Sequence, residues 1–242
     1  MKLKNDMQLF FAEKIEGETA FLSETESRHC LKVLRKKEGD CLQVTDGRGI
    51  CYTGELFIIK KRLAAIGKLA VVDQQERRHP LLSLAIAPTK NNSRLEWLLE
   101  KAVEIGLDEL QPFVSKHSER RKINERRLSD IAVSAMKQSG RYQLPEIQPL
   151  VKLEDLLDSQ IDGKVMNLVG SQSSDMDISE IDLSGKNKIR LFIGPEGDFS
   201  EEEWSLMHQK DFVFVNLGNF RLRTETAGMV GVTLINSLIN KI

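Results

Sequence analysis

The sequence predicts an α/β protein with a small, β-rich N-terminal domain at residues 1–73 and a larger domain at residues 74–242. Short apolar runs separated by turn residues fill the first part, which is typical of small barrels. From residue 81 onward apolar runs alternate with helical patterns, as in largely parallel sheets covered by helices on both faces. Residues 74–80 are polar and end in proline, so we expect the boundary there.

The N-terminal domain is expected to contain five strands and one helix. A turn at Glu16-Gly17 joins the first two strands, and residues 46–49, Asp-Gly-Arg-Gly, predict a hairpin. The helix is expected at Glu24–Lys37, with Leu31 and Leu34 facing inward. The strands are expected at residues 9–11, 19–22, 41–45, 50–59 and 63–72.

In the larger domain, Ser93 and Glu96 form a capping-box pattern that predicts a helix through Ile105, ended by Gly106. Further strands are expected at residues 81–87, 110–114 and 164–169, and further helices at residues 128–138 and 151–157. A final, mostly apolar helix is expected at residues 225–240. Its Gly228 and Gly231 indicate close contact with another backbone, since each glycine costs a helix roughly 1 kcal/mol relative to alanine.

Two strand-like runs near the C-terminus each end in a glycine turn that leads into a helix. Residues 191–193 precede Gly194-Pro195-Glu196-Gly197, and residues 212–215 precede Leu217-Gly218. Ligands of such sheets bind beyond the carboxyl ends of the strands, so both loops are expected at one site. Either loop alone is better explained by an ordinary tight turn, but two such loops on neighbouring strands favour a binding site.

The residue types in these loops indicate which ligand fits. Glycine lets the backbone approach a flat ligand closely, and Pro195 stiffens the turn. Ser200 and Glu203 form a second capping-box pattern. The three carboxylates of residues 201–203 suit a helix N-terminus but repel phosphate, so the sequence predicts a ligand without phosphates.

The composition argues against a membrane protein, a secreted protein and a cysteine-based metal site. No apolar run approaches the roughly 18 residues of a membrane span, and the first residues lack the pattern of a signal peptide. Three cysteines without a CxxC pair favour a reducing cytoplasm and give no metal site.

The net charge of the chain is −1, but the charge is unevenly distributed. Residues 116–141 carry eight Lys or Arg and three Asp or Glu, a local net of +5. Residues 150–210 carry six Lys or Arg and thirteen Asp or Glu, a net of −7. The basic segment is either a solvated surface or an RNA contact.

The two glycine loops resemble a known family. GPEGDFS at residues 194–200 and LGNFRLRTETA at residues 217–227 are similar to the signature loops of RNA uracil-N3 methyltransferases that modify 16S, small-subunit ribosomal RNA, within the SPOUT superfamily. Weaker matches at residues 29–40, 90–106 and 138–141 extend the resemblance over nearly the whole chain. The family pattern usually has glycine where Asp198 stands and Arg-Ile where Phe220-Arg221 stand.

The resemblance implies a PUA-like RNA-binding barrel followed by a SPOUT domain, in which the C-terminal helix threads through a loop as a trefoil knot. It also implies methyl transfer from S-adenosylmethionine. We expect Arg223, with Arg221 as second candidate, to stabilise the developing uracil anion, and Glu225 to accept the proton, to brace Arg223, or to be an ordinary first-turn carboxylate. The expected cofactor-binding residues are Leu168, Ile193, Gly194, Pro195, Glu196, Gly197, Leu217, Gly218, Leu222, Thr226 and Ala227.

The implied partner is small-subunit ribosomal RNA or the assembled 30S subunit, and the implied assembly is a homodimer. The basic residues expected to hold the RNA backbone are Arg28, Arg35, Lys36, Arg120, Arg121 and Arg141. Three alternatives stay open: a non-catalytic RNA-binding protein that keeps the pocket, a SPOUT enzyme acting on another RNA, and an α/β enzyme for another nucleotide. The last lacks the GxGxxG and GxxxxGK[ST] patterns.

Overall fold

The structure of the protein is a computed structural model that describes residues 8–60, 62–158 and 163–240. The chain divides into two compact units, each of which is described separately. The first comprises the chain up to Arg77 together with Met136–Leu144, and the second comprises Arg78–Ala135 and the chain from Pro145 onward. The division after Arg77 falls within the polar segment, but the return of residues 136–144 to the first unit is not visible in the sequence.

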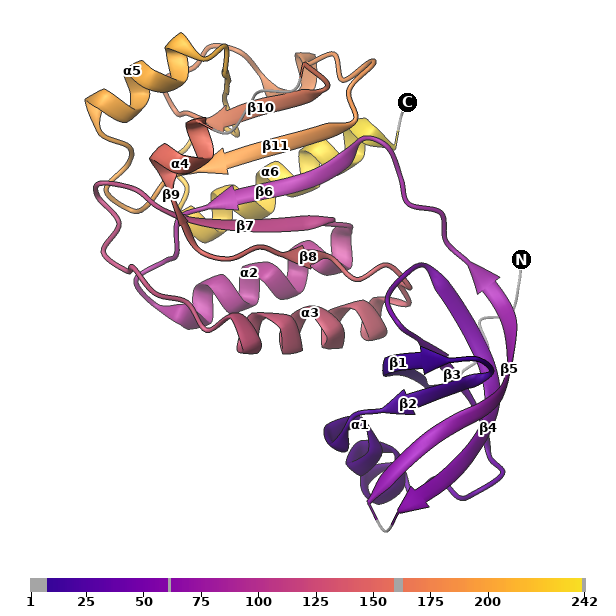
Figure 1. The fold of residues 1–242 in the computed structure, drawn as a ribbon. Helices are drawn as coiled ribbons and strands as arrows, with labels where there is room; N and C mark the ends of the chain where they lie inside the picture. Colours follow the sequence, from indigo (N-terminus) through magenta and orange to yellow (C-terminus); the bar gives the residue numbers. More distant parts are fainter. Residues whose placement is uncertain (1–7, 61, 159–162, 241–242) are drawn as a thin grey trace. The chain divides into compact units, whose positions relative to one another are not determined.

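The first unit is a closed five-stranded barrel in the order β1-β2-β5-β4-β3 (Figure 1). Neighbouring strands are antiparallel except β1 and β3, which are parallel and close the barrel. Alternate apolar residues fill the interior, with Phe10, Leu42 and Leu56 fully or almost fully buried. The strands are β1 (Leu9–Glu16), β2 (Thr19–Leu22), β3 (Cys41–Thr45), β4 (Ile50–Lys60) and β5 (Leu63–Gln74).

The expected helix at Glu24–Lys37 is shorter than predicted. It consists of α1 (Glu24–Arg28) and one wider turn, η1 (His29–Val33). Ser23 caps the start, because its Oγ accepts the Glu26 N–H at 3.1 Å. Arg35 has φ +53°, a left-handed conformation in which a right-handed helix cannot continue. Leu31 and Leu34 pack against the barrel core, as expected.

Residues 136–144 pack on the barrel through the β3–β4 hairpin. The Gly49 N–H donates to Tyr142 O and the Leu144 N–H donates to Gly47 O, both at 2.8 Å. A Cβ on Gly47 would lie only 2.7 Å from Leu144 Cβ, so glycine is required there for this close approach. Burial raises the pKa of the Cys51 thiol, and burial also raises the pKa of Tyr142 to about 12.

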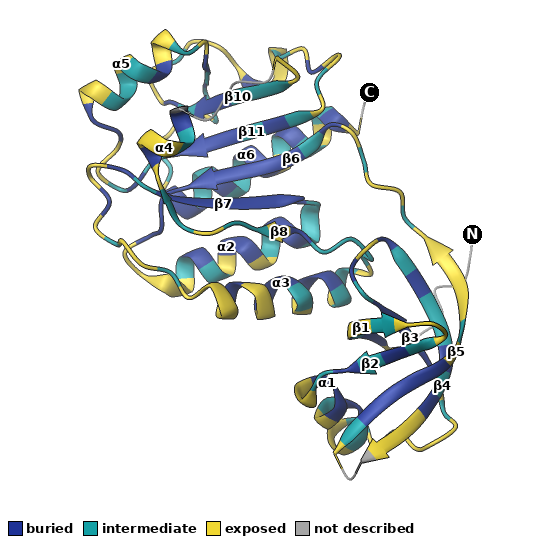
Figure 2. Ribbon diagram, viewed as in Figure 1, coloured by how far each residue is buried: buried dark blue, intermediate teal, exposed yellow. Residues whose placement is uncertain are grey.

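The second unit is built on a parallel sheet in the order β12-β10-β11-β6-β7-β8, with β9 paired to β7. The central strands are buried on both faces (Figure 2), which explains their continuous apolar sequences. The strands are β6 (Leu81–Ile86), β7 (Glu109–Val114), β8 (Glu146–Ile147), β9 (Val151–Lys152), β10 (Val165–Gly170), β11 (Lys188–Ile193) and β12 (Val213–Val215).

Helices cover both faces of this sheet. On one face, α4 (Leu153–Asp158) and α5 (Glu201–Gln209) enclose an aromatic core that includes Phe113, Phe192 and Phe212. On the other face, α6 (Thr224–Ile239) packs on β6, β11 and α2 (Asn92–Ile105). Helix α3 (Glu125–Ser139) is tied to α2 by an ion pair of Arg127 with Glu96 at 3.1 Å. A short 3-10 turn, η2 (Ile178–Glu180), follows β10.

Two details differ from the sequence prediction. Asn91, not Ser93, caps α2, since its Oδ1 accepts the Ser93 N–H at 3.0 Å. The segment expected as one helix from Val151 begins as strand β9, because residues 151 and 152 pair with β7, and the helix starts at Leu153. Gly106 ends α2 with φ +127°, as expected.

The two glycines of α6 lie close to side chains rather than to a second backbone. A Cβ on Gly228 would lie 3.0 Å from Leu98 Cδ2, and a Cβ on Gly231 would lie 2.2 Å from Leu191 Cδ2. The expected contact with another backbone is therefore not found at these glycines; the close contacts are with side chains of α2 and β11. Threading of this helix as a knot stays a prediction. In the described part of the chain, no helix combines the length and apolar character needed to cross a membrane.

Candidate functional site

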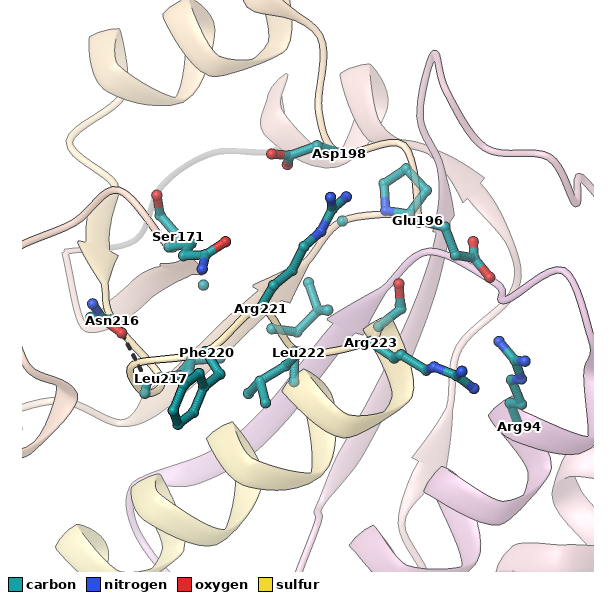
Figure 3. A pocket seen from close by; sticks show the side chains of 18 residues that line it. Arg94, Ser171, Glu196, Asp198, Asn216, Leu217, Phe220, Arg221, Leu222 and Arg223 are labelled. Atoms are coloured by element: carbon teal, nitrogen blue, oxygen red, sulfur yellow. Dashed lines mark hydrogen bonds between the residues drawn. The ribbon is translucent and has the colours of Figure 1, made fainter.

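A cavity of about 490 Å³ lies at the carboxyl ends of β10, β11 and β12 (Figure 3). Three loops form it: the one after β10, the one between β11 and α5, and the one between β12 and α6. The last loop runs directly into the N-terminus of α6, so residues far apart in the sequence meet here. Its lining residues are Arg94, Gly170, Ser171, Gln172, Ile193, Gly194, Pro195, Glu196, Asp198, Asn216, Leu217, Gly218, Phe220, Arg221, Leu222, Arg223, Thr224 and Ala227.

The loop after β11 is held rigidly. Ser200 and Glu203 form the capping box expected from the sequence, with Glu203 Oε2 accepting the Ser200 N–H at 2.8 Å and Ser200 Oγ accepting the Glu203 N–H. Asp198 has φ +64°, and its Oδ1 accepts the Phe199 N–H at 2.8 Å. A short polar side chain tolerates this left-handed conformation, which explains how Asp198 can stand where the resembling family usually has glycine.

The basic segment after β7 supports the same loop. Lys116 donates its backbone N–H to Glu203 at 2.8 Å and its Nζ to Glu202 at 3.0 Å. The second contact lowers the pKa of Glu202 to about 2, so the start of α5 stays negatively charged. Nδ1 of His117 lies 3.2 Å from Gly197 O and 3.1 Å from Asp198 O. The loop is thus held by its own capping box and by Lys116 and His117. Only the first of these two features is visible as a sequence motif.

The walls of the cavity require glycine at two positions. A Cβ on Gly170 would lie 2.9 Å from Ile193 Cδ1 and 3.0 Å from Leu217 Cδ1. Gly218 has φ +142° and no atom within 4 Å of an added Cβ, so its backbone faces open space. Its N–H donates to Asn216 Oδ1 at 2.8 Å, which fixes the turn.

Three arginines surround the cavity. Figure 3 shows Arg221 extending across it toward Asp198, while Arg223 points toward Arg94. Among the residues that the structure describes, the guanidinium groups of Arg221 and Arg223 have no hydrogen-bond or ion-pair partner. The Arg94 guanidinium pairs with Glu225, with 3.6 Å between Nε and Oε1. Positive charge is therefore available to an anionic group in the cavity.

Most of the residues expected from the sequence meet here. Arg221, Arg223 and eight of the eleven expected cofactor-binding residues line the cavity. Leu168 is fully buried in β10, and Gly197 and Thr226 stand next to lining residues. Glu225 is 8% exposed, lies behind the wall in the first turn of α6, and leaves its Oε2 buried without a partner.

The expected RNA-binding residues lie on both units. Arg120 and Arg121 belong to the loop between β7 and α3, where Arg120 donates to Lys90 O at 2.7 and 3.0 Å and Arg121 donates to Lys116 O at 3.2 Å. Arg28 and Arg35 are exposed on the first unit, Lys36 is half-buried there, and Arg141 lies in the segment that returns to it.

Sequence reasoning missed several lining residues, chiefly Arg94, Ser171 and Asn216. Arg94 lies in the first turn of α2, within one of the weaker matches, and nothing in its spacing marks it as a site residue. Ser171 and Asn216 each directly follow a strand. Their place at the carboxyl ends of neighbouring parallel strands is the signal that would have identified them.

Both parts of the chain match known protein families. A family described as RNA methyltransferase domain matches residues 77–236, and one described as RNA methyltransferase PUA domain matches residues 22–68. The chain belongs to the RNA methyltransferase family. This membership confirms the predicted class of enzyme and the predicted two-part architecture of a PUA-like barrel with a SPOUT methyltransferase domain.

Relatives of the enzyme match it over almost their whole length. Ribosomal RNA small subunit methyltransferase E of Bacillus subtilis is 26% identical, covering 95% of this chain and 96% of the relative. The crystal structure of a probable rRNA-methyltransferase from Porphyromonas gingivalis is 35% identical, with a TM-score of 0.87 and coverage of 97% and 99%. A ribosomal RNA small subunit methyltransferase E from Neisseria gonorrhoeae bound to S-adenosyl methionine is 27% identical, with a TM-score of 0.84 and coverage of 96% and 98%.

Proposed function

We propose that this enzyme transfers a methyl group from S-adenosylmethionine to N3 of a uridine in small-subunit ribosomal RNA. The observation that carries the proposal is the cavity at the ends of β10, β11 and β12, where both glycine loops meet Arg221 and Arg223, whose guanidinium groups have no partner among the described residues. The N. gonorrhoeae relative, similar over nearly the whole chain, binds S-adenosyl methionine. The names of the relatives support ribosomal RNA of the small subunit as substrate, and the resemblance of the loops supports N3 of uridine as the acceptor.

The residues of the cavity fit an adenosine-bearing ligand. Its volume of about 490 Å³ lies within the range of roughly 300–1,000 Å³ for small-molecule sites. Ile193, Leu217 and Leu222 supply apolar walls for the adenine. Gly194 and Gly218 expose backbone for hydrogen bonds to the base and ribose. Leu168, buried in β10, supports the wall from behind.

When bound, the sulfonium of S-adenosylmethionine supplies an already activated methyl group. The task of the protein is then to align the uridine N3 with that methyl group, and such positioning can supply roughly 7–11 kcal/mol. N3 carries a proton at neutral pH, and its loss places negative charge on the uracil oxygens. We assign the stabilisation of that charge to Arg223, whose guanidinium is available in the cavity, with Arg221 as second candidate.

Glu225 is a candidate for accepting the N3 proton or for holding a neighbouring arginine. In the described part of the chain its ion pair is with Arg94, at 3.6 Å, rather than with Arg223. Its burial and its unpartnered Oε2 favour a role in holding Arg94 in place. Removal of the N3 proton is then left to solvent or to a group of the RNA.

We propose that the RNA backbone is held by the basic residues of both units, in a homodimer in the cytoplasm. Arg120 and Arg121 lie in the segment that supports the loop after β11. Arg28, Arg35, Lys36 and Arg141 would contact RNA from the first unit.

Sedimentation equilibrium of the purified protein tests the homodimer: a monomer at micromolar concentration contradicts it.

The function is tested by incubating the enzyme with methyl-labelled S-adenosylmethionine and small ribosomal subunits from cells that lack the modification. Nucleoside analysis should find N3-methyluridine at one position in the RNA. Naked small-subunit RNA and large subunits serve as parallel substrates. Label in another nucleoside or another RNA overturns the substrate assignment, and no label in any RNA overturns catalysis on RNA.

A further inference from the structure

We propose that Asp198 and Arg221 bind the α-amino acid end of the methyl donor, with Arg221 on its carboxylate and Asp198 on its ammonium group. This inference rests on the proposed function, because it concerns the donor that the function requires. It goes further by assigning a zwitterion subsite at the rim of the cavity to two side chains.

The two residues come from different loops and face one another. Asp198 belongs to the loop after β11 and Arg221 to the loop after β12, and both line the cavity. Figure 3 shows the side chain of Arg221 extending across the cavity toward Asp198. Both are exposed, and in the described part of the chain no ion pair joins them within 4.0 Å. Opposite charges thus stand across a gap without neutralising each other.

The carboxylate of Asp198 is positioned before any ligand arrives. Its Oδ1 accepts the Phe199 N–H at 2.8 Å, and among the described residues its Oδ2 has no hydrogen-bond partner. The neighbouring carbonyls of Gly197 and Asp198 contact His117, so the backbone that carries Asp198 is held as well. A pre-positioned partner loses less side-chain entropy when it binds.

The cavity separates into apolar and charged parts. Ile193, Leu217, Leu222 and Ala227 provide the apolar part, and Asp198 and Arg221 contribute opposite charges at the rim. An α-amino acid carries a carboxylate and an ammonium on one carbon, so it satisfies both side chains at once. A nucleotide phosphate would meet Arg221 but would be repelled by Asp198. The pair therefore favours an adenosine that carries an amino acid over one that carries phosphate.

Calorimetry with two stable ligands isolates this contact. S-Adenosylhomocysteine keeps the amino acid, and 5′-methylthioadenosine has the same adenosine and sulfur without it. Arg221→Gln and Asp198→Asn each remove one charge, and asparagine tolerates the left-handed φ at position 198. We expect each substitution to weaken S-adenosylhomocysteine about tenfold, the loss typical of one charge-assisted hydrogen bond, and to leave 5′-methylthioadenosine unchanged. Arg48→Gln, at an exposed position of the barrel, is the matched control for loss of a positive charge.

The double variant distinguishes a shared ligand from a direct pair. If both residues bind the amino acid, their effects multiply, to about a hundredfold. A double variant no weaker than either single one contradicts the inference, because it would show that the two residues serve mainly to pair with each other. Unchanged binding of S-adenosylhomocysteine, or equal losses for both ligands, also overturns it. Those results leave the proposed function intact, whereas a wild-type enzyme that binds neither ligand contradicts both.

Discussion

Nε of Arg94, in the first turn of α2, lies 3.6 Å from Oε1 of Glu225, in the first turn of α6. Glu225 is 8% exposed, whereas Arg94 lines the cavity. A buried carboxylate is costly without a cation, so this contact holds the two helix N-termini together and positions the Arg94 guanidinium at the cavity. Arg94 and Glu225 are therefore expected to act as a unit.

That expectation is tested by a double-mutant cycle. Arg94→Ala and Glu225→Gln should each lower kcat by about tenfold, and the double variant should be no slower than either one, because residues in contact do not contribute independently. Single-turnover methylation of small subunits is the measurement. If the two losses multiply, Glu225 works independently of Arg94, and proton acceptance becomes its role.

Arg223 is predicted to act mainly on the transition state. Arg223→Ala should lower kcat by roughly 10²–10³-fold, the loss seen when one donor to a developing oxyanion is removed, with little change in the affinity for S-adenosylmethionine. Arg223→Lys keeps the charge and should restore part of the rate. Equal losses in turnover and in donor affinity would assign Arg223 to donor binding instead.

Gly54 is predicted to be essential to the barrel but not to the cavity. A Cβ at this position would lie 2.5 Å from Gly67 O on the paired strand β5, and backbone cannot move aside as a side chain can. Gly54→Ala should lower the free energy of unfolding by about 2–3 kcal/mol, measured by urea denaturation. Gly163→Ala, where an added Cβ has nothing within 4 Å, should be neutral. Gly54 belongs to the first unit, whereas every lining residue of the cavity belongs to the second, and Gly163 does not line the cavity. Calorimetry below the unfolding transition should therefore find unchanged donor affinity in both variants.

Glu109 is predicted to make the stability of the second unit depend on pH. Burial raises its pKa, but hydrogen bonds from Lys188 at 2.8 Å and Ser83 at 2.7 Å, together with the charge of Arg190, bring the pKa below its ordinary value of 4.5. A lowered pKa means that the ionised carboxylate stabilises the fold above its ordinary pKa and that this stabilisation is lost as pH falls through the lowered value.

The measurement compares wild type with Glu109→Gln. At pH 7 the substitution should cost about 3 kcal/mol, because it leaves the Lys188 ammonium without its carboxylate. The difference between the two free energies of unfolding should shrink as the pH falls below the ordinary carboxyl pKa of 4.5 and through the lowered pKa of Glu109. A difference that stays constant with pH would show that Glu109 contributes by packing alone.

Site residues that lie together in one stretch of sequence were predicted. Site residues that the fold brings in from distant parts of the chain were missed. The loops at residues 194–200 and 217–227 were found because glycine spacing and capping are visible in a single stretch. The inward placement of Leu31 and Leu34 was expected, but not the φ of +53° at Arg35, a conformation in which the N-terminal helix cannot continue. Arg94 was missed because its place beside Glu225 depends on how α2 packs against α6, a contact between residues 131 positions apart. Tertiary contacts of this kind leave no mark in periodicity.

The return of residues 136–144 to the barrel has a consequence for any attempt to dissect the molecule. A fragment cut after Arg77 would lack the segment whose Tyr142 carbonyl and Leu144 amide bond the glycines of the β3–β4 hairpin. The other fragment would carry that segment with no surface to receive it. The barrel therefore cannot be transplanted with all of its contacts by a single cut, and it would have to be grafted with residues 136–144 attached.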